Sequence, residues 1–487
     1  MSDAPPAEAR PVAPLWTILA VTAVVAAVFY AFHVEGEWWL DLNPKALGAL
    51  RTRHFVPLIA RSGFAIGLWS LPALGVLGLF LLSARALFLR TSVRPAVLLL
   101  ASIAFFFAIG TSVGMIDGYI ATYDRSLQPA VLYPYTQPFA SYADVPRVET
   151  KGPANFLRNF PRRQLNDVMA NHSRTHPPGP VLFLWVVSRL FGPGLVPAWL
   201  ATVLFASLTT IPVFFLARDL YGETAARRAL ALFLLVPSVI LFTTTSMDGP
   251  MMVFLVAAIW AFLRATAERA RWWWSAIVSG LALALASFMT YTASYLLLFF
   301  GVIAVLAFFT DRPRFWRIAR LVPVAALTCL AFYGALYLAV GYDPIAALQR
   351  AVWANNELVG TGHGTFVQYL HVSLSNLFAF LFGMGFALVA VWLLEVKVAA
   401  ERVRAGEQAD LFVLAFPISL LVITFSALYT LEVERIWMFM ALMLTLAAGR
   451  YLDDRLRRGG GDAAFYWTAG LLALQVLCAE TFFDTLW

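Results

Sequence analysis

Two histidines and an arginine lie close together in the segment 171–179, whose sequence is NHSRTHPPG. Arginine and histidine together can bind a phosphate, because the planar guanidinium donates paired hydrogen bonds to phosphate oxygens. His172 and His176 also have a spacing that metal ligands use, although the prolines oppose a regular helix through both. The structural alternative is a proline-capped turn at the membrane surface, where Arg174 and the histidines meet anionic lipid headgroups. The residue types therefore predict a phosphate site or a lipid-contacting turn, with a metal site as the minority interpretation.

Several aspartates lie at or near the ends of apolar segments. Asp117 follows the apolar stretch 95–116 directly, Asp124 comes seven residues later, and Asp248 lies in a very short turn between two further apolar stretches. A partly desolvated carboxylate at the mouth of a helix can serve as a general base. The plainer interpretations are a residue that marks the water interface for Asp117 and an N-cap of the helix that starts at Pro250 for Asp248. Position alone favours the plainer interpretation for Asp117 and leaves Asp248 open.

A third group of charges lies in the segment 431–437, LEVERIW, between two apolar stretches. Arg435 would lie just inside the bilayer, paired with Glu432 or Glu434 and still available to a phosphate. A salt bridge that pins two helices together is the competing interpretation. The polar loop 341–372 predicts either a lid over this face or a tethered surface loop.

These side chains must be positioned by helices in a membrane. The chain has 487 residues, of which 61% are hydrophobic and 13% charged, and its mean hydropathy is +0.76. This composition excludes a water-soluble protein, and the apolar runs are long enough to cross about 30 Å of hydrocarbon. We therefore predict an all-α polytopic membrane protein with about thirteen transmembrane helices. The candidate spans are 13–33, 64–88, 95–116, 195–217, 229–246, 249–267, 273–290, 292–309, 317–340, 373–396, 410–429, 435–450 and 463–483.

The arginines predict the orientation of these spans. They gather in alternate loops, as the positive-inside rule requires, provided that the apolar stretch 180–191, which is too short to span, does not cross. The N-terminus is then cytoplasmic, and the functional residues face the outer, periplasmic side of a bacterial inner membrane. The long outer loop 117–194 carries the segment 153–167, whose apolar residues recur at helical spacing. That pattern predicts an amphipathic helix on the membrane surface. The remaining outer loops are 34–63, 341–372 and 430–434.

The sequence also excludes several classes of protein. It has no Gly-rich phosphate loop, no DxD pair on a soluble domain and no nucleophile elbow. The formal charge of +7 indicates membrane orientation rather than nucleic-acid binding. Cys329 and Cys478 lie in apolar runs and indicate neither a disulfide framework nor a metal site. Because the cytoplasmic loops are too short to bind a nucleotide-activated donor, we expect any donor to arrive on a lipid.

The order of these features resembles the C-type integral-membrane glycosyltransferases, in particular the branch with the protein O-mannosyltransferases and the aminoarabinose transferase of lipid A. The resemblance covers residues 95–450. Two spans precede the helix that would be the family's first, and Tyr291 stands where many relatives have lysine. The matching features are a span that ends in Asp117, a long outer loop, the His-Pro-Pro element 176–178, Asp248 in a short outer turn, and the segment 434–437.

The resemblance implies inverting sugar transfer from a polyprenyl-phosphate donor to an acceptor hydroxyl. Asp117, or else Asp124, would accept the proton of the acceptor hydroxyl as it attacks the anomeric carbon. The cations that would stabilise the departing lipid phosphate, and supply the charge of the missing lysine, are Arg174, His176 and Arg435. Supporting or acceptor-binding roles fall to His172, Asp248, Tyr291 and Glu434. The scheme requires no cofactor, although some relatives bind a divalent metal at the outer site.

Three parts of the chain follow from this interpretation. Residues 1–94 form an N-terminal tail with two extra transmembrane helices, 95–309 the catalytic core with its outer loop, and 310–487 the C-terminal helices. The acceptor would be a lipid, a glycan or a protein. The alternative function is a transporter or flippase for a lipid-linked or anionic substrate. The lack of an inverted repeat, and polar residues at one face instead of the midplane, count against that alternative.

Overall fold

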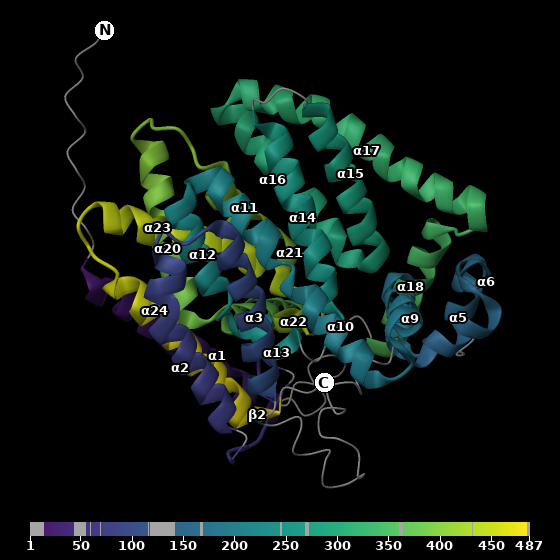
Figure 1. The fold of residues 1–487 in the computed structure, drawn as a ribbon, viewed down its shortest axis with the longest axis horizontal. Helices are drawn as coiled ribbons and strands as arrows, with labels where there is room; N and C mark the ends of the chain where they lie inside the picture. The colour runs from purple at the N-terminus through teal and green to yellow at the C-terminus, as the bar shows by residue number, and fades with distance from the viewer. Residues whose placement is uncertain are drawn as a thin grey trace.

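The computed structural model describes residues 14–42, 55–58, 60–68, 70–114, 116, 142–165, 169–243, 246–267, 272–359, 364–430 and 432–484 (Figure 1). Most of these residues are helical, as expected of a chain whose backbone polar groups must be satisfied inside lipid. The first helices are α1 (Leu15–Leu42), α2 (Ser70–Ala84), α3 (Pro95–Gly114), α5 (Val145–Lys151), α6 (Pro153–Arg158), α7 (Phe160–Leu165), α8 (Asn171–Thr175), α9 (Gly179–Phe191), α10 (Leu195–Ser207), α11 (Thr210–Tyr221), α12 (Glu223–Phe233) and α13 (Pro237–Thr243). They are followed by α14 (Asp248–Thr266), α15 (Trp272–Met289), α16 (Ser294–Thr310), α17 (Arg312–Val340), α18 (Pro344–Val359), α19 (Phe366–Met384), α20 (Phe386–Arg404), α21 (Leu411–Thr424), α22 (Val433–Ile436), α23 (Ala441–Arg457) and α24 (Ala463–Phe482). Short π or 3-10 segments are η2 (Arg85–Leu89), η5 (Tyr142–Asp144), η6 (Tyr291–Ala293) and η7 (Met438–Met440), and two-residue strands β1 (Arg61–Ser62) and β2 (Phe483–Asp484) pair antiparallel.

The prediction of a multi-pass helical membrane protein is confirmed. Within the described ranges, ten helical segments are long and apolar enough to cross a membrane, or eleven if the bent pair α12 and α13 is one span. The sequence predicted about thirteen. The stretch 180–191 forms α9, a helix of 13 residues and about 20 Å, which is shorter than the hydrocarbon. The predicted span 410–429 contains α21, which is 14 residues long and so also counts among the shorter apolar helices.

The prediction of one continuous span over 373–396 is wrong. The chain forms α19 up to Met384 and begins a new helix, α20, at Phe386. Gly385 between them has a φ of +88°, outside the range that a right-handed helix allows. A Cβ at this position would lie 2.3 Å from Cδ2 of Leu472, so the break is also a close approach to α24. Hydrophobicity along the segment is continuous, and for that reason the sequence pattern missed the break.

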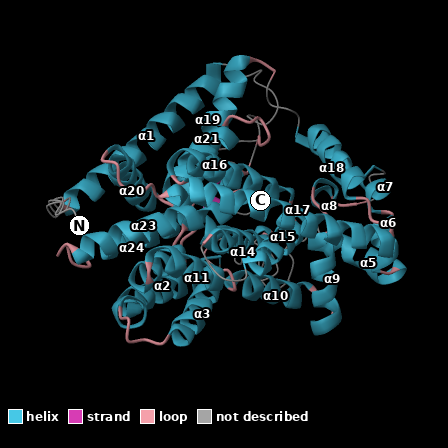
Figure 2. Cartoon of the chain, turned by 90° about the horizontal axis from the view of Figure 1, so that it is seen from above, coloured by secondary structure: helices cyan, strands magenta, loops and turns pink. Residues whose placement is uncertain are grey.

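The structure also differs from the prediction of one surface helix over 153–167. The described part consists of two short helices, α6 and α7, interrupted at Asn159. Their apolar residues Phe156 and Phe160 are fully buried in a cluster with Val181 of α9 and Tyr342. The apolar face therefore packs against protein instead of lipid. The two views of the fold agree that α5, α6, α9 and α18 lie together beside the main bundle (Figures 1 and 2).

The described arginine-rich loops gather at one end of the bundle, along the upper and left sides of Figure 1. Arg227 donates to the carbonyl oxygens of Arg90, at 2.7 Å, and of Val93. At the same end, ion pairs of 2.6 Å join Arg228 to Asp462 and Arg402 to Asp454, and Arg317 donates to the carbonyl of Thr266 at 2.9 Å. Loops far apart in the sequence are thus cross-linked at this end, which we call the arginine end.

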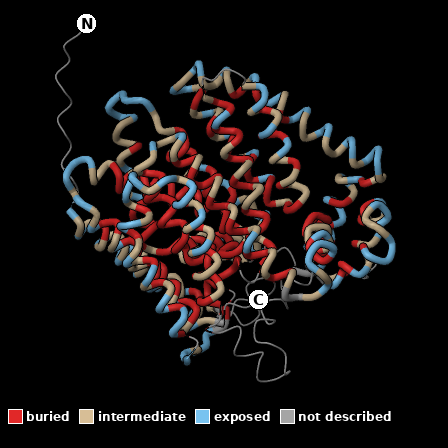
Figure 3. Tube along the Cα trace, viewed as in Figure 1, coloured by how far each residue is buried: buried red, intermediate tan, exposed pale blue. Residues whose placement is uncertain are grey.

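Burial is concentrated in the centre of the bundle, around α12, α13, α14 and α23 (Figure 3). The long helix α17 is much less buried: only 11% of the residues in its most apolar stretch are buried inside the protein. Its side chains along most of its length are therefore available to lipid (Figure 3). Helix α14 begins at Asp248, at its end opposite to the arginine end, and Arg435 lies beside Asp248 there.

Candidate active site

The site is built around the buried guanidinium of Arg435 in the one-turn helix α22. Its Nε lies 3.4 Å from Oδ2 of Asp248, the first residue of α14, and its Nη2 forms an ion pair with Oε2 of Glu432. The side chains of Arg435 and Asp248 are only 4% and 13% exposed. At such depth an unpaired charge is strongly disfavoured, so each charge stabilises the other. No hydrogen bond or ion pair joins the Nη1 group of Arg435 to a described residue.

Local geometry holds these charges in place. Glu432 adopts a left-handed conformation with a φ of +61°, which turns the chain sharply into α22. The hydroxyl of Ser246 donates to Oδ2 of Asp248, and the Asp248 N–H donates back to Ser246 Oγ at 3.0 Å. Gly383 lets α19 approach α22, because a Cβ there would lie 3.1 Å from the carbonyl oxygen of Glu434. Arg435 is therefore fixed by elements from three different parts of the chain.

The His-Pro-Pro segment forms a second group of functional side chains. Arg174 in α8 is buried, and its Nε donates to the carbonyl of Gln164 at 3.1 Å while the Gln164 amide donates to the carbonyl of Arg174 at 2.9 Å. Nη2 of Arg174 forms an ion pair with Glu357 of α18 at 3.1 Å. Nδ1 of His176 lies 3.0 Å from Oγ1 of Thr175. These bonds join α7, α8 and α18 into one layer beside the membrane bundle.

The next residues dock this layer onto the bundle. Gly179 opens α9 directly against the end of α15, since a Cβ there would lie 2.3 Å from the carbonyl oxygen of Phe288. Tyr291, three residues beyond Phe288, begins η6. Its hydroxyl is buried and has no hydrogen-bond partner among the described residues. Met247, the residue before α14, and Met251 of its first turn belong to the same apolar cluster as Val181 of α9. The two groups of charges are thus linked through packed apolar side chains.

The structure brings some of the predicted site residues together and leaves others apart. Asp248, Glu434 and Arg435 lie at one place, whereas no contact within the described ranges joins Arg174 to Asp248 or Arg435. Arg174 is instead held by Glu357, which the sequence indicated only as part of a polar loop. The two residues are 183 positions apart, and nothing in their local sequence predicts the pair. Asp117 and Asp124 lie outside the described residues, and so does the side chain of His172.

A metal site was a minority interpretation of the sequence. Within the described ranges, no group of three or more His, Cys, Asp or Glu side chains is arranged to hold a metal ion. The charges that the described part of the site offers to an anion come from guanidinium and imidazole groups.

Comparison with known proteins supports the predicted resemblance. A family model described as dolichyl-phosphate-mannose-protein mannosyltransferase matches residues 175–337, beginning within the His-Pro-Pro segment. No curated protein sequence matches the chain significantly. Among solved structures, the oligosaccharyltransferase of Archaeoglobus fulgidus, in complex with zinc and sulfate, is similar with a TM-score of 0.50 and 16% identity over 77% of this chain. A further similarity, at a TM-score of 0.34 and 16% identity over 75% of this chain and 78% of the other, is to ArnT from Cupriavidus metallidurans in the apo state.

The resemblance to C-type integral-membrane glycosyltransferases is confirmed by the family match together with the shared fold. The similarity covers 53% of the archaeal chain, so this protein spans about half of that relative's length. At 16% identity the likeness to the archaeal protein concerns the fold.

Proposed function

We propose that this protein is a membrane glycosyltransferase that moves a sugar from a polyprenyl-phosphate donor to an acceptor hydroxyl, with inversion, on the periplasmic face of a bacterial inner membrane. The observation that carries the proposal is the buried Arg435, which keeps donors free beside Asp248 at the end of the bundle opposite to the arginine end. The core of the activity would lie in residues 95–309, and Arg435 would reach it from the C-terminal helices.

Arg435 would bind the donor phosphate through the part of its guanidinium that no carboxylate occupies. In the reaction the bond between the anomeric carbon and the phosphate oxygen breaks, and negative charge develops on the leaving phosphate. A fixed cation in a water-poor site stabilises that charge without having to reorganise. Asp248 and Glu432 keep the guanidinium in place, so its position does not depend on the substrate being bound. We assign Arg174 and His176 to the same phosphate, approached from the α8 layer.

The base would be Asp117, with Asp124 as the alternative, because both follow the apolar stretch 95–116 in the sequence. It would accept the proton of the acceptor hydroxyl while that oxygen attacks the anomeric carbon. His172, Tyr291 and Glu434 would orient the acceptor or the sugar. The free hydroxyl of Tyr291 supports such a role, since a buried hydroxyl without a partner is costly unless a ligand supplies one.

The test is a single-turnover assay of the purified protein with a panel of polyprenyl-phosphate sugars, in which the release of free polyprenyl phosphate is measured. Asp117→Asn and Arg435→Lys are each expected to slow release by about 100-fold or more, because each removes a group that acts in the transition state. Lys397→Gln is the control, since Lys397 lies on α20 near the arginine end and its side chain is 72% exposed. It should release polyprenyl phosphate at the rate of the unchanged protein.

A folded, lipid-bound protein that releases no polyprenyl phosphate from any donor would contradict the proposal. Transport of the same donors across vesicle membranes would then be measured, because a flippase moves a lipid-linked substrate without cleaving it. Equal loss of release in the Lys397→Gln control would show that the assay reports stability instead of chemistry.

A further inference from the structure

Two adjoining cavities lie at the arginine end, away from the candidate active site. The larger has a volume of about 370 Å³ and the smaller about 240 Å³. They share three lining residues, Leu220, Arg314 and Gln408. Asp248 and Arg264, which lines the smaller cavity, are 16 residues apart on α14, so about 24 Å separates the cavities from the candidate active site. The cavities therefore form a separate site.

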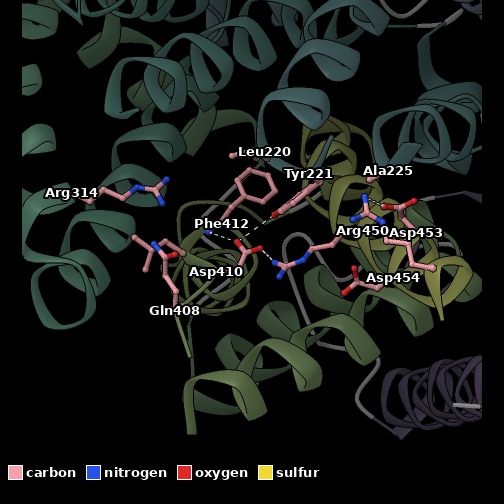
Figure 4. Close-up of a pocket in the computed structure, with 13 residues that line it drawn as sticks. Leu220, Tyr221, Ala225, Arg314, Gln408, Asp410, Phe412, Arg450, Asp453 and Asp454 are labelled. Carbon is pink, nitrogen blue, oxygen red and sulfur yellow. Dashed lines mark hydrogen bonds and ion pairs between the residues drawn. The ribbon is translucent and has the colours of Figure 1, made fainter. Parts of the chain in front are cut away.

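The acidic residues of the larger cavity are already neutralised by the protein. Asp410 forms an ion pair with Arg450, accepts from the Tyr221 hydroxyl at 3.3 Å, and caps the first backbone N–H groups of α21 (Figure 4). Asp453 pairs with Arg457 at 2.8 Å, and Asp454 pairs with Arg402 at 2.6 Å.

The acidic residues of the smaller cavity are bonded too. Asp219 accepts from the indole N–H of Trp260 at 3.1 Å, and Asp311 accepts the backbone N–H of Arg314 at 3.0 Å. The carboxylates of both cavities are therefore engaged, and they do not call for a cation.

Arg314 is a cation that lines both cavities. Its guanidinium has no hydrogen bond and no ion pair with any described residue, and its Nε is buried. It extends from the first turn of α17 toward the side of the larger cavity where Leu220 and Phe412 lie (Figure 4). Gln408, whose side-chain amide can donate, also lines both cavities and is exposed. Two groups of donors thus meet where the cavities join, and Arg264 and Arg317 add positive charge on the smaller side.

The depth of the site in the membrane indicates where its ligand comes from. Tryptophans surround this end: Trp260 lines the smaller cavity, Trp272 lies under the guanidinium of Arg320 at 4.6 Å, and Trp316 is 66% exposed. Tryptophan side chains collect at the level of the lipid headgroups. Basic residues at this level are attracted to the anionic headgroups of the surrounding lipid.

We propose that Arg314 and Gln408 bind the phosphate of an anionic membrane lipid in the paired cavities at the arginine end. A phosphate accepts paired hydrogen bonds from one guanidinium, and a side-chain amide can supply a further donor. This site is distinct from the proposed sugar-transfer site and does not depend on that function. It ties α17 to the loop before α21, since Arg314 and Gln408 belong to these two elements.

The test measures lipid binding to the full-length protein by native mass spectrometry after removal of bound lipid. The probes are phosphatidylglycerol, which is anionic, phosphatidylcholine, which is not, and inorganic phosphate. Arg314→Gln is expected to weaken the binding of phosphatidylglycerol by about tenfold or more, because a charge-assisted bond to phosphate is lost. Arg312→Gln is the matched control, since Arg312 makes the same charge change two residues away, packs over the ring of Phe308 at 3.8 Å and lines neither cavity.

Arg314→Lys separates binding from folding, because it keeps the charge but loses the planar fork, so it should retain an intermediate affinity. Thermal unfolding without added lipid checks that all variants are folded. Inorganic phosphate that binds as tightly as phosphatidylglycerol would assign the site to a dissolved anion and overturn the lipid source. Equal losses of phosphatidylglycerol affinity in Arg314→Gln and Arg312→Gln would mean that any positive charge on this surface attracts the lipid, and would overturn the proposal. No loss of affinity in either variant would overturn it as well.

Discussion

Replacing Arg435 by glutamine tests whether its guanidinium holds together the end of the bundle opposite to the arginine end. The substitution keeps a polar side chain of similar reach but removes the positive charge. Asp248 and Glu432 would remain, with side chains 13% and 27% exposed. Glu434, which is buried, contributes a third negative charge nearby. The variant therefore leaves the partly buried carboxylates of Asp248 and Glu432 without their common counterion.

The expected cost is set by the burial of the partners. Breaking a buried ion pair by removing one member typically lowers the free energy of unfolding by about 3–5 kcal/mol. Arg435 is 4% exposed and forms two such pairs, so we expect a value in this range instead of the small value of a surface pair. Removing Asp248 as well, in Arg435→Gln with Asp248→Asn, should recover about 1–3 kcal/mol through the coupling of the two residues.

The assay is reversible unfolding in mixed detergent micelles with increasing dodecyl sulfate, followed by tryptophan fluorescence. Lys397→Gln provides the comparison, because it also removes one positive charge from an ion pair. Lys397 lies 3.9 Å from Glu401, and the two side chains are 72% and 42% exposed. This exposed pair should contribute no more than about 0.5 kcal/mol.

Two results would refute the reasoning about Arg435. One is an Arg435→Gln variant that unfolds at the same detergent fraction as Lys397→Gln. The other is a double variant that is less stable than Arg435→Gln alone by the full cost of Asp248→Asn, since additive effects mean that the two side chains do not interact.

Two further predictions concern close packing and the wall of the larger cavity. Gly179→Ala should destabilise the protein by about 1–3 kcal/mol and slow the release of polyprenyl phosphate. The added Cβ would lie 2.3 Å from the carbonyl oxygen of Phe288 and push α9 away from α15. Gly301→Ala on α16, whose Cβ would meet nothing within 4 Å, is its control and should match the unchanged protein in both measurements. Asp410→Ala should lower the free energy of unfolding by about 3 kcal/mol or more, since it uncaps α21 and leaves Arg450 without one of its partners. Asp410→Asn retains a capping oxygen and should lose less; an equal loss in both would mean that the cap contributes nothing.

Much of the architecture could be predicted from composition and periodicity. Apolar runs of the length of α3, α14 or α16 can only be stable helices in lipid, because an unpaired backbone group in hydrocarbon is too costly. The gathering of arginines in alternate loops likewise predicted one arginine end, where the ion pairs of Arg228 and Arg402 are found. Both signals are local or additive along the chain, so that a single sequence carries them.

Helix breaks inside apolar stretches, and the burial of apolar helix faces by protein, could not be predicted in this way. The helix break at Gly385 lies in a continuously hydrophobic stretch. Leu472, which Gly385 approaches closely, is 87 residues away in the sequence. Phe156 and Phe160 have the spacing of a membrane-surface helix, yet they pack into the protein because α9 and α18 fold over them. Periodicity shows which face of a helix is apolar, but it does not show whether lipid or protein covers that face.

The candidate site shows the same division. From sequence alone, the residue types in the segments 171–179 and 431–437, and the acid at 248, predicted anion chemistry at one end of the spans. Only the tertiary structure decided that Arg435 meets Asp248 while Arg174 meets Glu357, and that the buried Nε of Arg314 has no hydrogen-bond partner among the described residues. The physical reason is that a charge buried near a membrane takes whichever opposite charge packing brings within about 4 Å, and packing depends on contacts between distant parts of the chain.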